Sequence, residues 1–67
     1  MVINIGRNKE NDVVIDNLKV SNCHAQMVID EESKIFINDL QSENGTFVNG
    51  EIINDPTELK TKDEVTI

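Results

Sequence analysis

Short apolar runs, separated by polar turn-forming residues, constrain the fold of this chain more than any other feature. The runs are three to five residues long and rich in Val and Ile, whose β-branched side chains suit the half-buried surface of a strand. No segment keeps an apolar period of roughly 3.6 residues over a window of about eleven residues, so we expect no long helix. The expected strands are 2–5, 13–15, 25–29, 35–37, 46–48, 51–53 and 65–67. Such strands predict an all-β fold, an antiparallel β-sandwich.

Three segments between the runs carry local structural signals. Asn49-Gly50 accepts positive φ at both residues and is flanked by apolar residues, which predicts a β-hairpin. The acidic segment 30–33 is expected to be a solvated turn between two further antiparallel strands. Pro56 is followed by a segment, 57–60, that is compatible with a single helical turn, because Pro and an acidic residue suit a first turn.

The length and charge of the chain exclude several classes of protein. A chain of 67 residues makes one domain at most and buries only about 60% of its unfolded surface. Little stability is then left to hold a deep catalytic cleft, which argues against an enzyme. The 13 acidic residues outnumber 6 basic ones and give a net charge of −7. This composition cannot form the broad basic surface that binds nucleic acid or an anionic membrane.

Cysteine content and hydropathy indicate a compartment. The single cysteine, Cys23, cannot form an internal disulfide. No segment has the composition of a signal peptide or the length of a membrane span. We therefore expect a soluble, reduced, cytoplasmic protein.

Neither a metal site nor a nucleophile–base pair emerges from the residue spacing. Cys23 and His24 are adjacent, so in an extended chain they point to opposite faces and cannot share a proton. One Cys and one His are also too few for a zinc site. Segment 40–51 matches several positions of an EF-hand loop, but its first position, Leu40, lacks a carboxylate. We expect no metal, cofactor or catalytic residue, with His24 a packed structural residue and Cys23 a buried thiol.

Three polar clusters are more informative. Gly6-Arg7 directly follows the first expected strand, and an arginine carries fixed donors that match a phosphate or a carboxylate. Segment 20–25 brings hydroxyl and amide groups to the start of a strand, where they either cap a turn or donate to an anion. Segment 42–50 holds two Asn-Gly pairs around one short strand, and so two tight backbone features.

Together, the three clusters resemble the forkhead-associated (FHA) domain. The hallmarks of that family are a Gly-Arg after an early strand, a Ser-x-x-His and an Asn-Gly-Thr-x-x-Asn-Gly. All three occur here in order, at Gly6-Arg7, 21–24 and 44–50. Segments 11–15 and 59–67 are similar to two further parts of the family pattern, so the resemblance spans essentially the whole chain.

The resemblance implies a β-sandwich of the SMAD/FHA type that binds phosphothreonine peptides through loops at one end. By position, Arg7 would contact the phosphate and Ser21 would hydrogen-bond one of its oxygens. Asn22 would contact the phosphate or the peptide, and Asn44 would hold the peptide main chain. The residues expected to support the loops are Gly6, His24, Gly45, Thr46, Asn49 and Gly50.

Four features depart from the family pattern. Asn22 stands where a basic residue is frequent. Glu43 stands where a small hydroxyl residue is common, and an acid facing the pocket would repel a phosphate. Lys62 replaces the glycine expected before Asp63. Family members usually run longer, so edge strands missing here would leave unpaired backbone and apolar surface.

We therefore expect residues 1–67 to form a single FHA-like domain, truncated at its edges, within a larger or oligomeric assembly. A second copy or an additional chain would complete the sandwich. The expected function is phosphothreonine-dependent binding of a partner protein, and neither nucleic acid nor membrane is an expected partner. The alternative is an FHA-like structural or oligomerisation module that reads little or no phosphate, which the net charge of −7, Glu43 and the shortened edges favour.

Overall fold

The computed structural model describes all of residues 1–67 and contains strands but no helix. The strands are β1 (Val2–Gly6), β2 (Val13–Val14), β3 (Ala25–Ile29), β4 (Ile35–Asp39), β5 (Phe47–Val48), β6 (Glu51–Ile52), β7 (Thr57–Leu59) and β8 (Val65–Thr66). Each expected apolar run contributes a strand, so the prediction of an all-β fold of short strands is confirmed. There is accordingly no helix long and apolar enough to cross a membrane.

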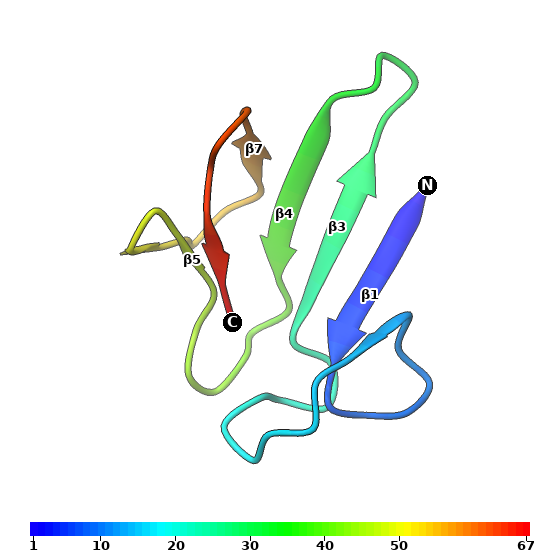
Figure 1. Cartoon of the computed structure of the whole chain (residues 1–67), viewed down its shortest axis with the longest axis vertical. Helices are drawn as coiled ribbons and strands as arrows, with labels where there is room; N and C mark the ends of the chain where they lie inside the picture. The colour runs from blue at the N-terminus through cyan, green and yellow to red at the C-terminus, as the bar shows by residue number, and fades with distance from the viewer.

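The strands form two sheets (Figure 1). The larger sheet has the order β2-β1-β3-β4-β7, and the smaller one has the order β6-β5-β8. The antiparallel pairing of β1, β3 and β4 places Ile3 opposite Met27 and Met27 opposite Ile37. Because side chains alternate along a strand, these residues share the face of the larger sheet that meets the smaller sheet.

The sandwich is antiparallel except at one pair of strands. β2 runs parallel to β1, with Ile5 opposite Val13. The loop between them turns back on itself, since the Asn11 N–H donates to the Asn8 carbonyl. The Asp12 carboxylate then accepts the N–H of Asn4 at the free edge of β1. β2 therefore pairs with the last two residues of β1 and runs in the same direction.

The segment after Pro56 is a strand, so the single helical turn considered for 57–60 is wrong. β7 pairs with β4, which places Thr57 opposite Ile37 and Leu59 opposite Ile35. Leu59 also packs against the core. Backbone pairing and apolar contact together outweigh a weak local preference for a helical start.

Cys23 is exposed, so the expectation of a buried thiol is also wrong. The next residue, His24, is completely buried. Because neighbouring side chains of an extended segment point to opposite sides, the burial of His24 leaves Cys23 in solvent.

The hairpin predicted at Asn49-Gly50 is confirmed. Their φ angles are 52° and 82°, and they join β5 to β6 with Val48 opposite Glu51. Positive φ at both central residues matches the right-handed twist of the two strands, which explains the Asn-Gly sequence.

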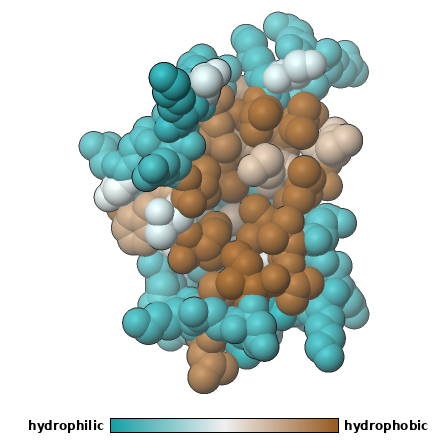
Figure 2. All heavy atoms as spheres, viewed as in Figure 1, coloured by the Kyte–Doolittle hydropathy of each residue, from teal (hydrophilic) through white to brown (hydrophobic).

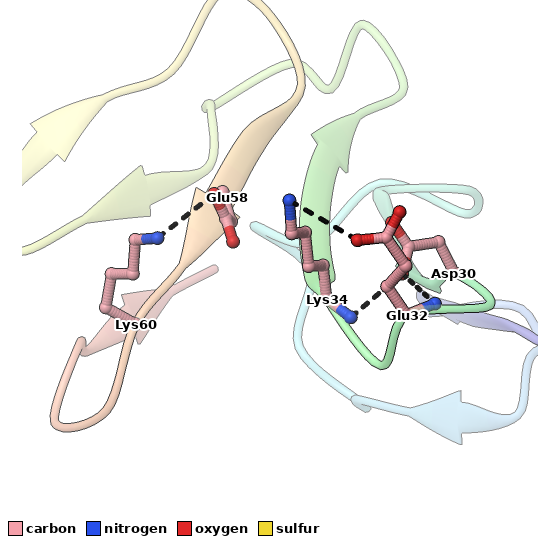
Figure 3. A network of polar contacts seen from close by, with 5 residues as sticks. All are labelled: Asp30, Glu32, Lys34, Glu58 and Lys60. Atoms are coloured by element: carbon pink, nitrogen blue, oxygen red, sulfur yellow. Dashed lines mark hydrogen bonds and ion pairs between the residues drawn. The ribbon is translucent and has the colours of Figure 1, made fainter.

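The predicted turn between β3 and β4 is confirmed as well. Oδ1 of Asp30 accepts the N–H groups of Glu32 and Lys34, each at 2.9 Å (Figure 3). The Lys34 ammonium lies 3.8 Å from the Glu32 carboxylate, and Lys60 lies 3.1 Å from Glu58 on β7. These ion pairs are exposed and contribute little stability, so the backbone-binding carboxylate of Asp30 defines the turn.

The core between the sheets is small. Ile5, Ala25 and Ile37 are its buried centre, and half-buried residues of both sheets pack around them. Further along the same face, Ile29 lies opposite Ile35, and both residues are only partly buried. Figure 2 shows the result as a broad apolar surface across the middle of the molecule. The smaller sheet thus covers only part of the apolar face of the larger one.

Candidate functional site

Three loops meet at one end of the molecule, below the sheets in Figure 1. They are the segment 7–12 after β1, the segment 15–24 before β3 and the segment 40–46 after β4. The N–H of Arg7 donates to the Ser21 carbonyl at 3.0 Å, which ties the first loop to the second. The side-chain amide of Asn44 donates to the Lys19 carbonyl at 2.7 Å, which ties the third loop to the second.

Arg7 projects from the end of β1 and is oriented by one backbone group. Its Nε donates to the carbonyl of Val20 at 3.0 Å in a half-buried position. Its two terminal nitrogens have no hydrogen bond within the chain, and no carboxylate forms an ion pair with it. The guanidinium therefore keeps a fixed direction while four N–H donors remain available for an anion.

Ser21 and Asn22 follow Val20 and offer further donors. Ser21 Oγ accepts the backbone N–H of Glu43 at 3.0 Å, so its hydroxyl hydrogen is free to donate to an anion. The Asn22 carbonyl accepts from Asn8 N and from the Asn11 side chain. The Asn22 side chain is exposed and has no hydrogen bond within the chain, so its amide is also available.

His24 joins the second loop to the third from inside the molecule. It is completely buried. Its Nδ1 accepts the N–H of Ser21 at 3.0 Å, and its Nε2 lies 2.8 Å from the Gly45 carbonyl. An Nδ1 that accepts requires the hydrogen on Nε2, so Nε2 donates to Gly45 and the ring is the neutral Nε2–H tautomer.

Asp39 at the end of β4 organises the third loop. It accepts hydrogen bonds from the hydroxyl groups of Ser42 and Thr46 and from the Ser42 N–H. Partial burial raises the pKa of Asp39, but these hydrogen bonds outweigh it and hold the pKa below its usual value. Thr46 is completely buried, and Asp39 supplies the acceptor that its hydroxyl needs.

Two members of this site, Asp39 and Asn11, were not expected from the sequence. Asp39 precedes Ser42 by three residues. An Asp at this spacing commonly accepts hydrogen bonds from the backbone and the hydroxyl of a following turn, so the sequence did contain a signal for Asp39. Asn11 donates to the carbonyls of Asn8 and Asn22 at 2.8 and 2.7 Å. Its partners are backbone carbonyls on two loops, and nothing in a sequence marks such acceptors.

The predicted site residues separate into two groups. Those brought together at the three loops are Gly6, Arg7, Ser21, Asn22, His24, Asn44, Gly45 and Thr46. Asn49 and Gly50 form the hairpin that follows the third loop, as expected for this pair. The Asn49 side chain bonds to Asp63 Oδ1 at 2.9 Å and to Glu64 N at 3.0 Å, so it fixes the β7–β8 turn rather than the loops. No group of three or more His, Cys, Asp or Glu side chains is arranged to hold a metal ion.

The sequence pattern of the FHA domain matches residues 3–67. The chain belongs to the FHA family. The chain is also similar to a curated protein, the transcriptional regulatory protein EmbR of Mycobacterium tuberculosis. The two sequences are 40% identical over 63 residues. That alignment covers 94% of this chain but only 16% of EmbR, so the chain spans about a sixth of the length of this relative.

Solved FHA structures have the same fold. The chain matches EmbR of M. tuberculosis in complex with a low affinity phosphopeptide at a TM-score of 0.92 and 39% identity, over 98% of this chain and 17% of that one. It matches the N-terminal FHA domain of S. cerevisiae Rad53p, in complex with a phosphothreonine peptide, at a TM-score of 0.92 and 31% identity. The match covers 100% of this chain and 56% of the Rad53p chain.

Proposed function

We propose that this FHA domain binds phosphothreonine-containing segments of partner proteins and thereby makes protein–protein interactions depend on phosphorylation. The observation that carries the proposal is the state of Arg7. Its guanidinium is held in place by the Val20 carbonyl, its terminal nitrogens are free, and no acid neutralises it. The solved complexes of EmbR and Rad53p with phosphopeptides support the same function.

The donors at the loops match the chemistry of a phosphothreonine. The phosphate carries about −1.5 to −2 charges near neutral pH and three strong acceptor oxygens. In this proposal Arg7 binds it as the principal cation, the Ser21 hydroxyl donates one hydrogen bond and the Asn22 amide another. Each charge-assisted bond contributes about 1.5–3 kcal/mol. In this proposal the domain binds the phosphate through hydrogen bonds and catalyses no reaction.

Asn44 is suited to hold the peptide main chain. Its donation to the Lys19 carbonyl leaves Oδ1 and one N–H without a partner. An amide that both donates and accepts pairs with the N–H and C=O of an extended peptide without reading its side chains. His24 and Asp39 act on this site indirectly, because they hold the loops that carry Ser21 and Asn44.

The decisive test compares Arg7→Ala with the unchanged domain in titrations of a phosphothreonine peptide. We expect an affinity loss of about 10- to 100-fold, because the variant loses the main charge-assisted bonds. The matched control is Lys34→Ala, which removes one positive charge from the β3–β4 turn and is expected to leave affinity unchanged. Equal binding by Arg7→Ala and the unchanged domain, or equal binding of the unphosphorylated peptide, refutes the proposal.

The half-covered apolar face favours a second candidate, an FHA-like structural or oligomerisation module. Residues such as Ile29 and Ile35 lie on this face and are only partly buried. We infer that the single domain of residues 1–67 works within a larger or oligomeric assembly in which another layer of polypeptide covers the face. A competing unphosphorylated segment that binds as well as the phosphopeptide would favour this function over phosphate reading.

A further inference from the structure

A hollow of about 300 Å³, lined mostly by polar residues but also by Cys23 and Leu40, lies beside the candidate phosphate site, on the face of the larger sheet that points away from the core. Its walls include Asn4 and Gln26, which are cross-strand partners on β1 and β3, and Asn8, Glu10 and Asn11 from the first loop. Asn4 alternates with the core-facing Ile3 and Ile5, which places it on the outer face. None of these five side chains binds the phosphate in the proposed function, although Asn11 joins the first two loops of the site through the Asn8 and Asn22 carbonyls.

Hydrogen bonds within the chain use both side-chain N–H groups of Asn11 and leave acceptor oxygens in the hollow, beside unused amide N–H groups of Asn4, Asn8 and Gln26. Nδ2 of Asn11 donates to both the Asn8 and the Asn22 carbonyl, so Oδ1 of Asn11 points away from these two carbonyls. Oδ1 accepts no hydrogen bond within the chain. Gln26 and Asn4 share one amide–amide bond of 2.9 Å, and one oxygen of this pair stays free whichever amide donates.

Glu10 adds a negative charge to these amide oxygens. Its backbone N–H is held by Asn8 Oδ1 at 3.0 Å, which fixes the main chain from which its side chain projects. Its carboxylate forms no ion pair within the chain. The hollow therefore presents one carboxylate without an ion-pair partner, which sets its charge, together with amide oxygens that accept no hydrogen bond. Such a set complements an ammonium or guanidinium group.

We propose that this hollow binds the side chain of a lysine or arginine that flanks the phosphothreonine of the partner. This inference rests on the proposed function. Asn8 follows Arg7 directly, and Cys23, another wall residue, follows Asn22. Consecutive Cα atoms are about 3.8 Å apart, and an extended peptide advances about 3.3 Å per residue. A basic residue within about three positions of the phosphothreonine therefore reaches the hollow while the phosphate stays at Arg7.

The site and the hollow together would recognise two opposite charges on the peptide, a phosphate and a nearby basic side chain. A phosphate is attracted to Arg7, and a neighbouring cation is attracted to Glu10. A long-range effect of the net charge of −7 would also favour basic peptides, but it would not depend on any single acid. Local recognition and long-range attraction are thus separable by removing one acid at a time.

The test titrates the whole domain with matched phosphothreonine peptides that carry either lysine or norleucine at each position from three before to three after the phosphothreonine. We expect at least one lysine position to raise affinity about fivefold in the unchanged domain, the size of an exposed but well-hydrogen-bonded ion pair. Glu10→Gln should reduce this preference to about twofold or less and leave the norleucine peptide unaffected. Glu31→Gln makes the same charge change in the β3–β4 turn at the far end of the molecule (Figure 1) and should keep the full preference.

Three other outcomes would overturn the inference, and the titrations distinguish them. Equal effects of Glu10→Gln and Glu31→Gln mean that only the overall charge attracts basic peptides. An unchanged domain that binds all phosphopeptides alike, with binding still dependent on Arg7 and on the phosphate, refutes the hollow and preserves the proposed function. Absence of any phosphate-dependent, Arg7-dependent binding refutes both.

Discussion

At the scale of single residues, Gly6 illustrates how closely two loops approach behind the candidate phosphate site. A Cβ at position 6 would lie 2.2 Å from the carbonyl oxygen of Asn22 and 2.8 Å from the Asn11 amide nitrogen. That carbonyl is the acceptor that joins the first loop to the second. Gly6 is therefore required by close approach of backbone, since its φ is not in the left-handed region.

We predict that Gly6→Ala weakens phosphopeptide binding and lowers the melting temperature. Forcing an extra carbon into a packed site costs about 1–3 kcal/mol, and the backbone shift separates Arg7 from Ser21. The control is Gly50→Ala, because a Cβ there meets nothing within 4 Å. Its positive φ makes that change strain the hairpin alone, so it should lower stability and spare affinity. Titration and thermal melts of both variants measure the difference, and equal affinity in the two variants contradicts the prediction.

At the scale of elements, the β7–β8 turn contains strain that its hydrogen bonds hold in place. Lys62 has a φ of 75°, in the region that favours glycine. Asp63 closes the turn by accepting the N–H of Lys60 at 2.7 Å and the side chain of Asn49 at 2.9 Å. These two hydrogen bonds, the one from Lys60 first, lower the pKa of Asp63 below its usual value. The turn therefore depends on a carboxylate and a hairpin residue from another element.

We predict that Lys62→Gly raises the free energy of unfolding by up to about 1 kcal/mol, because glycine adopts positive φ without a Cβ clash. Thermal melts measure the change. Lys60→Gly is the matched control, since it removes the same charge from a residue without positive φ and adds backbone entropy to the unfolded chain. The Lys60–Glu58 ion pair that it also removes lies at the surface and contributes little stability. A Lys62→Gly domain no more stable than the unchanged one would show that the turn is not strained.

At the scale of the whole molecule, the two faces of the larger sheet differ in what they leave open. The outer face carries the polar hollow and two exposed valines, Val2 and Val14, whereas the inner face carries a larger set of apolar side chains that the smaller sheet covers in part (Figure 2). Only 8 of the 67 residues are buried, so the core is small, as expected for a chain of this length.

We predict that the 67-residue chain alone self-associates through the inner face. Sedimentation velocity over a range of concentrations should show a mass above that of the 7.5 kDa monomer. Ile29→Lys, which places a charge on this face, should shift the population toward monomer. Val14→Lys, a change at an exposed apolar residue outside this face, should not. A stable monomer with a cooperative melt would contradict the prediction.

Much of the site was predictable because its residues lie in short local patterns. Arg7, Ser21 and Asn44 stand at fixed places relative to strand ends and tight turns, and the structure brings their loops together. The oxygens that orient Arg7 and Asn44 belong to the backbone of Val20 and Lys19. Every residue has a backbone carbonyl, so no residue type marks these acceptors in advance.

The sequence by itself determined the strand content, the hairpin and the family, because β-branched runs, Asn-Gly pairs and ordered motifs act over a few residues. Only the tertiary structure decided that 57–59 pairs with β4, that β2 runs parallel to β1 and that Cys23 faces solvent. It also decided which polar groups keep free donors at Arg7 and free acceptors near Glu10. The physical reason is that pairing and hydrogen-bond satisfaction join residues far apart in the chain, and local preference is too weak to specify such partners.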